Sequence, residues 1–393
     1  MSLGAAPNLA VEAELAPHAP TSAIGAVGAI AEERISVATQ RQLMWWRFRK
    51  HRLAVLATVV VGLFYVSVVL AGFLAYADPE ASEAQRGLIA PQPIHLFDDG
   101  GFHPYINGLT GQRDPRTFKR VYQVDPTKKL PLTFFTQGFS YKLLGLIPTD
   151  RHLLGVEGGP AEENLFLLGT DQEGRDVWSR LMYGTQTSLT IGLVSVALSL
   201  VLGVVLGGVS GFYGGMIDTV IQRVVEILRS VPTIPLWVGL AAAMPRDWDI
   251  IRVYFAITLI ISLIGWTELA RVVRGRFLSL RQEDFVMAAE LAGCSTRRII
   301  FVHLVPLFMS HIIAATTLAL PAMVISETSL SFLGLGLRPP AISWGVLLQE
   351  AQNVQTVAIS PWLLLPAVPV ILVILAFNFL GDGLRDAADP YGV

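Results

Sequence analysis

The feature that most constrains the fold is an uncharged apolar run from Leu53 to Tyr76, which reads LAVLATVVVGLFYVSVVLAGFLAY. At about 1.5 Å per residue, a helix of this length crosses a hydrocarbon core of about 30 Å. The preceding stretch, WWRFRKHR at 45–52, supplies aromatic and basic side chains suited to the cytoplasmic interface. The run therefore predicts a first transmembrane helix over 47–77 that enters from the cytoplasm.

Composition extends this conclusion to the whole chain. Its 393 residues are 52% hydrophobic and only 15% charged, too apolar for an ordinary soluble domain. Five further apolar spans are predicted, at 187–210, 219–243, 252–272, 307–330 and 361–381. Arginines are concentrated between the fourth and fifth spans, which places that loop and both termini in the cytoplasm. We predict an all-α polytopic membrane protein with six transmembrane helices.

Two regions outside the spans differ in composition. Residues 1–46 are rich in Ala, Pro and Gly without an apolar period, which predicts a disordered cytoplasmic tail; a signal peptide is the alternative. Residues 78–168 contain many turn formers and alternating fragments such as LPLTFF. They predict a small extracytoplasmic domain, α+β or mostly β, before a core of five transmembrane helices over 169–393. A cytoplasmic location of 78–168 is the alternative.

Several functions are disfavoured by what the sequence contains. A net charge of −2 offers no field that would attract nucleic acid. The single cysteine, Cys294, can form neither an internal disulfide nor a thiolate metal site. The chain has no G-x-x-x-x-G-K-[ST] loop and no H-E-x-x-H motif. We therefore expect no ATPase, cofactor, metal site or catalytic residue within this chain.

Small residues recur at every fourth position of the second span. A stripe of this kind lies on one helix face and lets another helix approach closely. The stripe consists of Ser195, Ser199, Gly203, Gly207, Gly211 and Gly215. The alternative is an intramembrane serine protease, with Ser210 of the sequence GVSG as its serine and His303 or His311 as the base.

A few polar groups fall within the spans, where an isolated charge costs at least about 2.5 kcal/mol. We expect Glu226 to pair with Arg229, and Glu268 to pair with Arg271 or an adjacent arginine. Candidates for lining a translocation path are Glu268, Glu327 and Asn378. An ion-driven transporter, which would need such groups in repeated positions, remains an alternative.

A short polar segment in the arginine-rich loop, MAAELAGCSTRRIIFVHLVP, interrupts the apolar chain. It predicts a helix over Asp284–Ala292, ended by Gly293 in a left-handed conformation and followed by a helix capped by Ser295. One helix face is apolar and small, with Phe285, Val286, Ala289 and Ala292. The other face carries Glu283, Asp284 and Glu290, which anionic lipid would repel. We predict a cytoplasmic knuckle, residues 281–306, that docks into another protein.

This segment resembles the coupling-loop motif of ABC importer permeases: a Glu-Ala-Ala triplet, three residues, Gly, nine residues, then Ile-x-Leu-Pro. Met287, Ala288 and Ala289 occupy the triplet, and Gly293 the glycine. The departures are Met287 for Glu, His303 for Ile and Val305 for Leu. The peptide branch of the family commonly ends H-x-L-P, so His303 points to that branch.

Longer segments resemble the dipeptide/oligopeptide (peptide/nickel) branch. The segment LLGTDQEGRDVWSRLMYGTQTSL (167–189) resembles the entry to the permease core of these transporters, with Gln186 where arginine is frequent. The segments ETSLSFLGLGLRPPAISWG (327–345) and NFLGDGLRDAADP (378–390) resemble the C-subunit type of permease in that branch. The N-terminal helix and the stretch YKLLGLIPTDRHLLGV (141–156) fit a subgroup with an enlarged extracytoplasmic domain. In the first segment, Thr170 and Glu173 predict a capping box for an interfacial helix that contains Val177 and Leu181.

The resemblance implies a permease subunit of an ATP-driven importer of di- or oligopeptides in the bacterial inner membrane, forming half of the translocation pathway. Implied partners are a second homologous permease, two cytoplasmic ABC ATPases that bind ATP and Mg, membrane lipid and an extracytoplasmic substrate-binding protein. Nickel or a modified peptide is the alternative substrate. The implied ATPase-coupling residues are Glu283, Asp284, Met287, Ala288, Ala289, Glu290, Gly293, Arg297 and Arg298.

Overall fold

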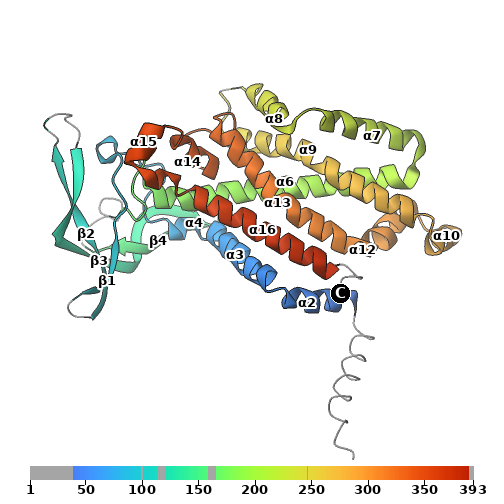
Figure 1. Ribbon diagram of the computed structural model, residues 1–393, viewed down its shortest axis with the longest axis horizontal. Coiled ribbons are helices and arrows are strands. Elements are labelled where there is room, and N and C mark those ends of the chain that lie inside the picture. Colours follow the sequence, from blue (N-terminus) through green and yellow to red (C-terminus); the bar gives the residue numbers. More distant parts are fainter. Residues whose placement is uncertain are drawn as a thin grey trace, which may run out of the picture.

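Long apolar helices run side by side along the longest axis of the molecule, and an antiparallel sheet lies at one end of them (Figure 1). This arrangement comes from a computed structural model, which describes residues 39–98, 101–113, 115, 120–157, 165–245 and 247–388. Most of the predicted tail, residues 1–38, lies outside the described residues.

The first span is divided into three helical pieces. They are α2 (Gln40–Lys50), α3 (Arg52–Val69) and α4 (Ala71–Leu74). The break before α3 occurs at His51, whose Nδ1 accepts a hydrogen bond from Ala54 N at 3.1 Å and caps that helix. Because α2 begins at Gln40, the predicted boundary of the tail at residue 46 is wrong.

The second span is a single 37-residue helix, α6 (Val177–Tyr213). Its N-cap is Asp176, which accepts a hydrogen bond from Ser179 N at 2.7 Å. The predicted capping box of Thr170 and Glu173 is therefore wrong, since the Asp171 carboxylate instead accepts from Glu173 N and Arg175 N and closes a turn. The separate interfacial helix is also wrong, because its residues form the buried first turns of α6.

The predicted span 219–243 is broken into two helices. The structure has α7 (Gly215–Ser230) and α8 (Thr233–Ala242), which meet at an angle of 88°. Pro232 lies at the break, and proline both lacks an amide hydrogen and disfavours the helical conformation of the residue before it. Within the described residues, five helices are long and apolar enough to cross a membrane, or up to six if the bent pair counts as one span.

The remaining helices complete the bundle and its two ends. They are η1 (Ala84–Arg86), α9 (Ile250–Leu280), α10 (Asp284–Leu291), α11 (Thr296–Arg298), the π-helical turn η2 (Ile299–Leu304), α12 (Val305–Leu307), α13 (Met309–Phe332), α14 (Trp344–Glu350), α15 (Val354–Ile359), η3 (Pro361–Leu364) and α16 (Ala367–Ala388). In the bundle, α13 packs against α16 and α6, and α16 packs against α3.

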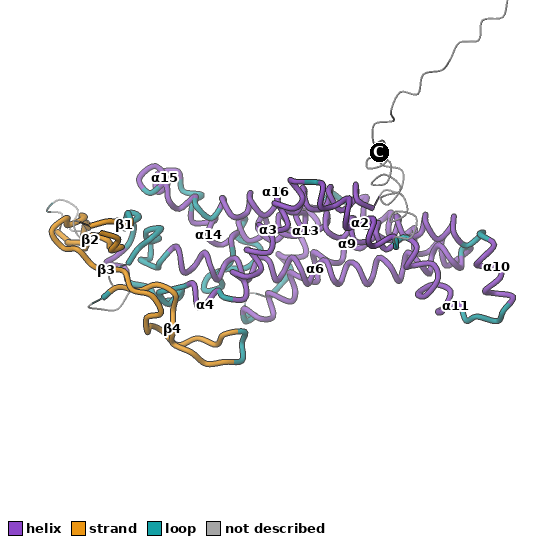
Figure 2. Tube along the Cα trace, turned by 90° about the horizontal axis from the view of Figure 1, so that it is seen from below, coloured by secondary structure: helices purple, strands orange, loops and turns teal. Residues whose placement is uncertain are grey.

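The region between α4 and α6 forms an antiparallel sheet of order β1-β2-β3-β4, in agreement with the predicted β content. The strands are β1 (Ile94–Asp98), β2 (Gly101–Arg113), β3 (Arg120–Leu143) and β4 (Ile147–Val156). The alternating fragment LPLTFF (130–135) belongs to one long strand, β3. Ile106 of β2 and Leu132 of β3 pack on Tyr76 and Leu165, which joins the sheet to one end of the bundle (Figure 2).

Small residues bring α6 and α9 into close contact. A Cβ atom added at Gly207 would lie 2.5 Å from the Ala270 carbonyl oxygen, and one at Gly211 would lie 2.8 Å from that of Arg274. A Cβ at Gly203 would meet the side chain of Leu269 at 2.9 Å. Gly215 is wrongly included in this stripe, because α6 ends at Tyr213 and Gly215 begins α7 with open space around it.

The substitution Gly207→Ala is expected to lower stability by about 1–3 kcal/mol, because the new methyl group overpacks the α6–α9 contact. Thermal unfolding in detergent measures the change. The matched control is Gly275→Ala on α9, where a Cβ has open space, so its stability should be unchanged or slightly raised. Equal melting temperatures for the two variants would contradict this account of the stripe.

Candidate functional site

The knuckle lies at the end of the bundle opposite the sheet, where α10 projects beyond the other helices (Figure 1). The helix ends in a Schellman motif: Cys294 N donates to Ala289 O at 3.0 Å, and Gly293 N donates to Glu290 O at 2.9 Å. Gly293 has φ +74°, which confirms the predicted left-handed position. The chain therefore reverses direction at a fixed point after α10.

The two faces of α10 differ from the prediction. Val286 is buried and Ala289 is half-buried, and both pack against a cluster that includes Phe277 of α9. These residues hold the knuckle on its own bundle, so the predicted docking face is divided. The most exposed apolar side chain of α10 is Leu291, at 91%, and Met287 is 48% exposed.

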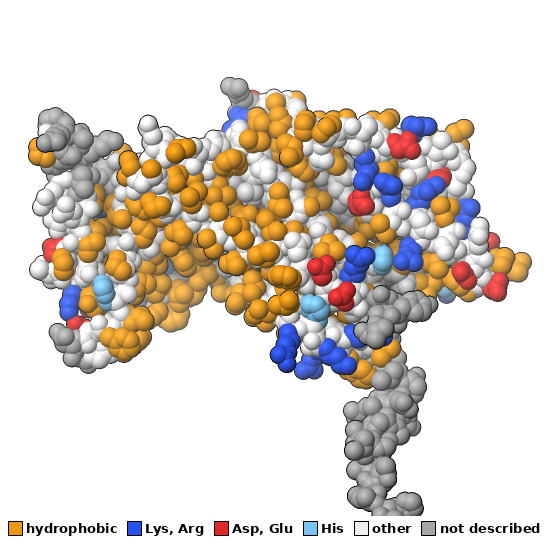
Figure 3. Space-filling view, in the orientation of Figure 1, with side chains coloured by type: hydrophobic (Ala, Val, Ile, Leu, Met, Phe, Trp, Pro, Cys, Tyr) orange, Lys and Arg blue, Asp and Glu red, His pale blue; other side chains and the backbone are white. Residues whose placement is uncertain are grey.

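Charged side chains surround this apolar tip. Glu283, Asp284 and Glu290 are exposed on and beside α10, and Arg297 and Arg298 are exposed on α11. Figure 3 shows acidic and basic side chains gathered toward this end of the molecule, next to a broad hydrophobic band over the middle of the bundle. Ser295 occupies the N-cap position of α11, but its side chain makes no capping hydrogen bond, so that predicted role is wrong.

A group of charged side chains next to the knuckle forms a junction between three helices, α6, α7 and α9. Arg274 of α9 donates to both carboxylate oxygens of Asp218 on α7, at 2.5 and 2.6 Å. The Arg281 guanidinium donates to the carbonyl oxygens of Gly211 and Phe212, at 3.3 and 3.2 Å, at the end of α6. Bidentate pairing fixes both position and orientation. Sequence reasoning missed this junction, although an acidic residue at the start of an apolar helix was a usable signal.

Ser210 takes part in the same junction. Its hydroxyl donates to Asp218 and accepts from Gln222 Nε2 at 3.1 Å. Within the part of the chain that the structure describes, neither His303 nor His311 is hydrogen-bonded to Ser210. The geometry therefore provides no base for the serine-protease alternative.

The ion pairs in the spans differ from those expected. Arg229 pairs with Glu268 of α9, and Glu226 pairs with Arg223 at 2.9 Å. Both expected pairings are wrong because Arg229 faces the neighbouring helix. Glu268 also lines a cavity of about 70 Å³ with Ser199 and Thr316. The Thr316 hydroxyl is buried there without a hydrogen-bond partner among the described residues.

The other two path candidates lie elsewhere. Glu327 is fully buried and accepts hydrogen bonds from the hydroxyls of Ser188 at 2.8 Å and Ser331 at 2.9 Å. Ser188 in turn accepts from Trp344 N at 3.1 Å, so Glu327 joins α13 to α6 and α14. Asn378 is exposed on α16. The structure does not bring Glu268, Glu327 and Asn378 together.

At the sheet end, a buried ion-pair network joins the start of α6 to α14. Arg180, only 1% exposed, pairs with Asp171 and with Glu350, the latter at 2.8 Å. Arg175 bonds to the same two carboxylates, at 2.7 and 2.9 Å. Removing one partner from such a network leaves a buried charge unpaired, which is strongly destabilising.

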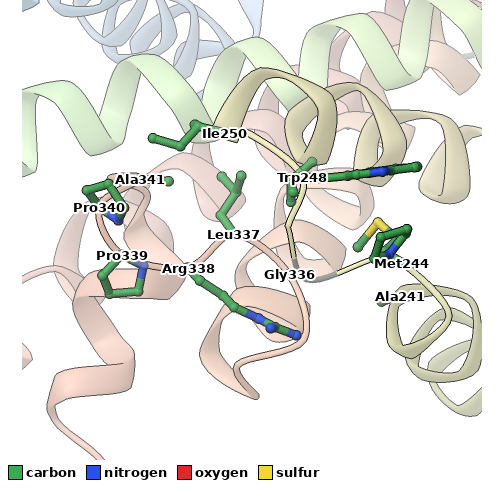
Figure 4. A pocket seen from close by; sticks show the side chains of 12 residues that line it. Ala241, Met244, Trp248, Ile250, Gly336, Leu337, Arg338, Pro339, Pro340 and Ala341 are labelled. Atoms are coloured by element: carbon green, nitrogen blue, oxygen red, sulfur yellow. The ribbon is translucent and has the colours of Figure 1, made fainter.

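A pocket of about 170 Å³ lies at the edge of this end, between α8, the connection to α9 and residues 336–341. Figure 4 shows Trp248 and Met244 on one side of the pocket, with Pro339 and Pro340 on the other. The Arg338 Nε donates to Gly334 O at 3.0 Å, and its side chain is exposed. Within the described ranges, no group of three His, Cys, Asp or Glu residues could hold a metal ion.

Membrane-length helices around a close-packed pair, with a charged knuckle at one end, define a multi-pass membrane protein. The chain belongs to the family of binding-protein-dependent transport system inner membrane components, whose model matches residues 187–391. A second model, the N-terminal transmembrane domain of oligopeptide transport permease C, matches residues 39–91. The resemblance to the C-subunit type of oligopeptide permease is thereby confirmed.

Individual relatives agree with this family. The chain is similar to the oligopeptide transport system permease protein OppC of Escherichia coli (strain K12), with 40% identity over 236 residues, which are 60% of this chain and 76% of the relative. OppC of Bacillus subtilis (strain 168) is 35% identical over 243 residues, or 62% and 76% of the two chains. The dipeptide transport system permease protein DppC of Alkalihalophilus pseudofirmus is 37% identical over 233 residues, or 59% and 73%.

The buried N-cap of α6 predicts a pH dependence of stability. Burial raises the pKa of Asp176 from 3.8 to about 6, although hydrogen bonds from Tyr76 and Ser179 oppose the rise. Because the folded state holds this proton more tightly than the unfolded chain, the contribution to stability is present below about pH 4 and is lost as the pH rises through about 6. The loss amounts to about 3 kcal/mol.

Thermal unfolding across this pH range, compared with that of Asp176→Asn, measures the effect. The variant has no titrating group at this position and keeps an N-cap side chain. Relative to the variant, the unmodified protein should become less stable as the pH rises from about 4 to about 7. A constant difference between the two proteins over this range would refute the assignment.

Proposed function

We propose that this chain is a permease subunit of an ATP-driven importer of di- or oligopeptides and forms half of the translocation pathway. The observation that carries the proposal is the construction of the knuckle. Val286 fixes α10 to the bundle, while Leu291 and Met287 are exposed at its tip. Such a tip suits docking into a groove of a motor protein. Family membership and the named relatives favour peptide as the substrate class.

A displacement of the knuckle would be transmitted to the helices through direct side-chain contacts. The knuckle packs on Phe277 of α9, and Arg274 of the same helix holds Asp218 on α7. The Arg229–Glu268 pair connects α7 to α9 a second time. We infer that α6, α7 and α9 tilt as one body when the ATPases close, and that the bend before α8 takes up the motion.

The orientation follows from charge. The arginine-rich end of the bundle, with the knuckle and α2, belongs in the cytoplasm, where positive loops are enriched. Both termini would then be cytoplasmic, in the bacterial inner membrane, and the sheet would be extracytoplasmic. The pocket at residues 336–341 would face outward, at the place where a substrate-binding protein delivers its cargo.

The proposed partners are a second homologous permease, two ATPases that bind ATP and Mg, and the substrate-binding protein. Nickel or a modified peptide is the alternative cargo of the same assembly. Affinity purification of the tagged chain from its native membrane tests the assembly, because ATPase subunits should be recovered with it. A chain that transports peptide alone in proteoliposomes would overturn the proposal.

The substitution Leu291→Asp is expected to lower substrate-stimulated ATP hydrolysis and peptide uptake about tenfold, because it places a charge in the docking contact. The residue is 91% exposed, so the fold should be unaffected. Gln282→Asp is the matched control, since it adds the same charge at an exposed position just before α10. Normal coupling in Leu291→Asp would show that α10 is not the docking element.

A further inference from the structure

The hairpin that joins β3 to β4 has an apolar tip, which consists of Leu143, Leu144, Gly145, Leu146 and Ile147. Leu146 is 81% exposed, Leu144 60% and Ile147 58%. From Leu143 to Ile147 the tip contains no polar side chain. Three large aliphatic residues exposed together at one turn form an apolar surface of the kind that marks an interaction site.

The combination of residue type and backbone conformation in this turn is unusual for a loop exposed to water. Gly145 N donates to Lys142 O and Leu146 N donates to Leu143 O, both at 3.1 Å, so the turn is tightly closed. Leu144 has φ +55°, a conformation that hairpin turns normally assign to Gly, Asn or Asp. A bulky apolar side chain therefore occupies a position where a small polar residue would have less backbone strain. Exposure of the turn to water does not explain why leucine is found there.

The base of the hairpin is fixed to the end of the first span. His152 Nδ1 lies 2.9 Å from Gly72 O, and its Nε2 lies 2.9 Å from Phe139 O. The Tyr141 ring covers Gly72 so closely that a Cβ there would overlap it. The position of the tip is thus set by rigid contacts with α4.

The tip points back along the helices. Figure 2 shows the β3–β4 hairpin leaving the sheet and running beside the bundle, so that its turn is level with helices and does not project beyond the sheet. The hairpin packs on α4, which follows α3 in the first span. Along that span, α3 exposes Leu63 and Val66, at 64% and 52%, on a surface that a membrane-spanning helix presents to lipid. Phe135 on β3 contacts Phe73 of α4 and is itself 62% exposed, which extends this surface toward the sheet.

We propose that the hairpin tip inserts into the membrane leaflet on the sheet side of the bundle, where its side chains contact lipid acyl chains. Lys142 is exposed at the base of the tip, where its ammonium group reaches the phosphate level while its stem lies along the apolar region. Tyr141 lies beside it, at the depth that tyrosine prefers. The hairpin packs on α4 at the end of the first span, and the same span exposes large apolar side chains along α3, so lipid is the occupant that the space beside the tip fits. The inference requires a membrane-embedded bundle and is independent of the transported substrate.

Site-directed fluorescence in the full-length chain tests the proposal. Leu146→Cys, combined with Cys294→Ser to leave one thiol, is labelled with a polarity-sensitive fluorophore. The protein is placed in nanodiscs of phosphatidylethanolamine and phosphatidylglycerol, with or without lipid that carries a nitroxide near the top of its acyl chain. The expected result is blue-shifted emission that the nitroxide lipid quenches severalfold more strongly than aqueous iodide does.

The matched control is Thr127→Cys in the same background, at an exposed polar position of the sheet. Its label should emit as in water and be quenched by iodide and not by the nitroxide lipid. If the label at position 146 behaves like the control, the tip lies in water and the proposal is overturned. If it is protected from both quenchers only when the partner subunits are present, the tip contacts protein, which overturns the proposal as well.

A second variant, measured with the same label, changes the apolar character of the tip. Leu144→Asn suits the positive φ of this position and should leave the turn folded, while it removes an apolar side chain from the tip. In the Leu146→Cys background this change should weaken nitroxide quenching at position 146 without changing the melting temperature in detergent. Unchanged quenching would also count against insertion.

Discussion

The close approach of α6 and α9 is the contact on which the other helix positions depend. Glycines at 203, 207 and 211 remove side-chain volume from α6, so that Gly207 and Gly211 meet the α9 backbone and Gly203 meets the side chain of Leu269. Apolar burial adds little between helices in lipid, so dense packing of this kind supplies the attraction. The approach brings the end of α6 within reach of Arg281, places α7 beside α9 and sets the height at which the knuckle leaves the bundle.

Charges are placed where helices join and not along an obvious channel. Arg274 and Asp218 join two helices near the knuckle, and Arg180, Asp171 and Glu350 join the turn before α6 to α14 at the opposite end. Each guanidinium has a carboxylate partner, which keeps the cost of burial low. The two ends of the bundle are thus each cross-linked by charge, while small side chains and the Arg229–Glu268 pair hold α9 to its neighbours between them. Tilting as a unit suits such a structure better than bending within it.

The sequence indicated those features that depend on neighbouring residues alone. The long helices were predicted from the length of the apolar runs. The left-handed conformation of Gly293 was predicted from its position after a helix C-terminus, and its φ of +74° confirms it. The bend at Pro232 was missed because the apolar run continues across it, although proline itself was a usable signal. The ion-pair partners of Arg229 and Glu268 were predicted wrongly, because ion pairing depends on which helices lie against each other in the folded bundle. Of the knuckle, the turn was predictable, whereas the division between its anchoring side and its exposed side was set by packing on Phe277.

The sheet enters and leaves the bundle at almost the same point. The Tyr76 hydroxyl, at the end of the first span, donates to Asp176 at 2.6 Å and accepts from Leu167 N at 3.0 Å, so one phenol fastens both ends of the intervening segment. The two matched family ranges, 39–91 and 187–391, leave most of that segment outside them. An insertion whose ends already adjoin closes its loop at little extra entropic cost, whatever its length. The chain can therefore gain, lose or exchange this module in evolution without altering the helices that carry transport.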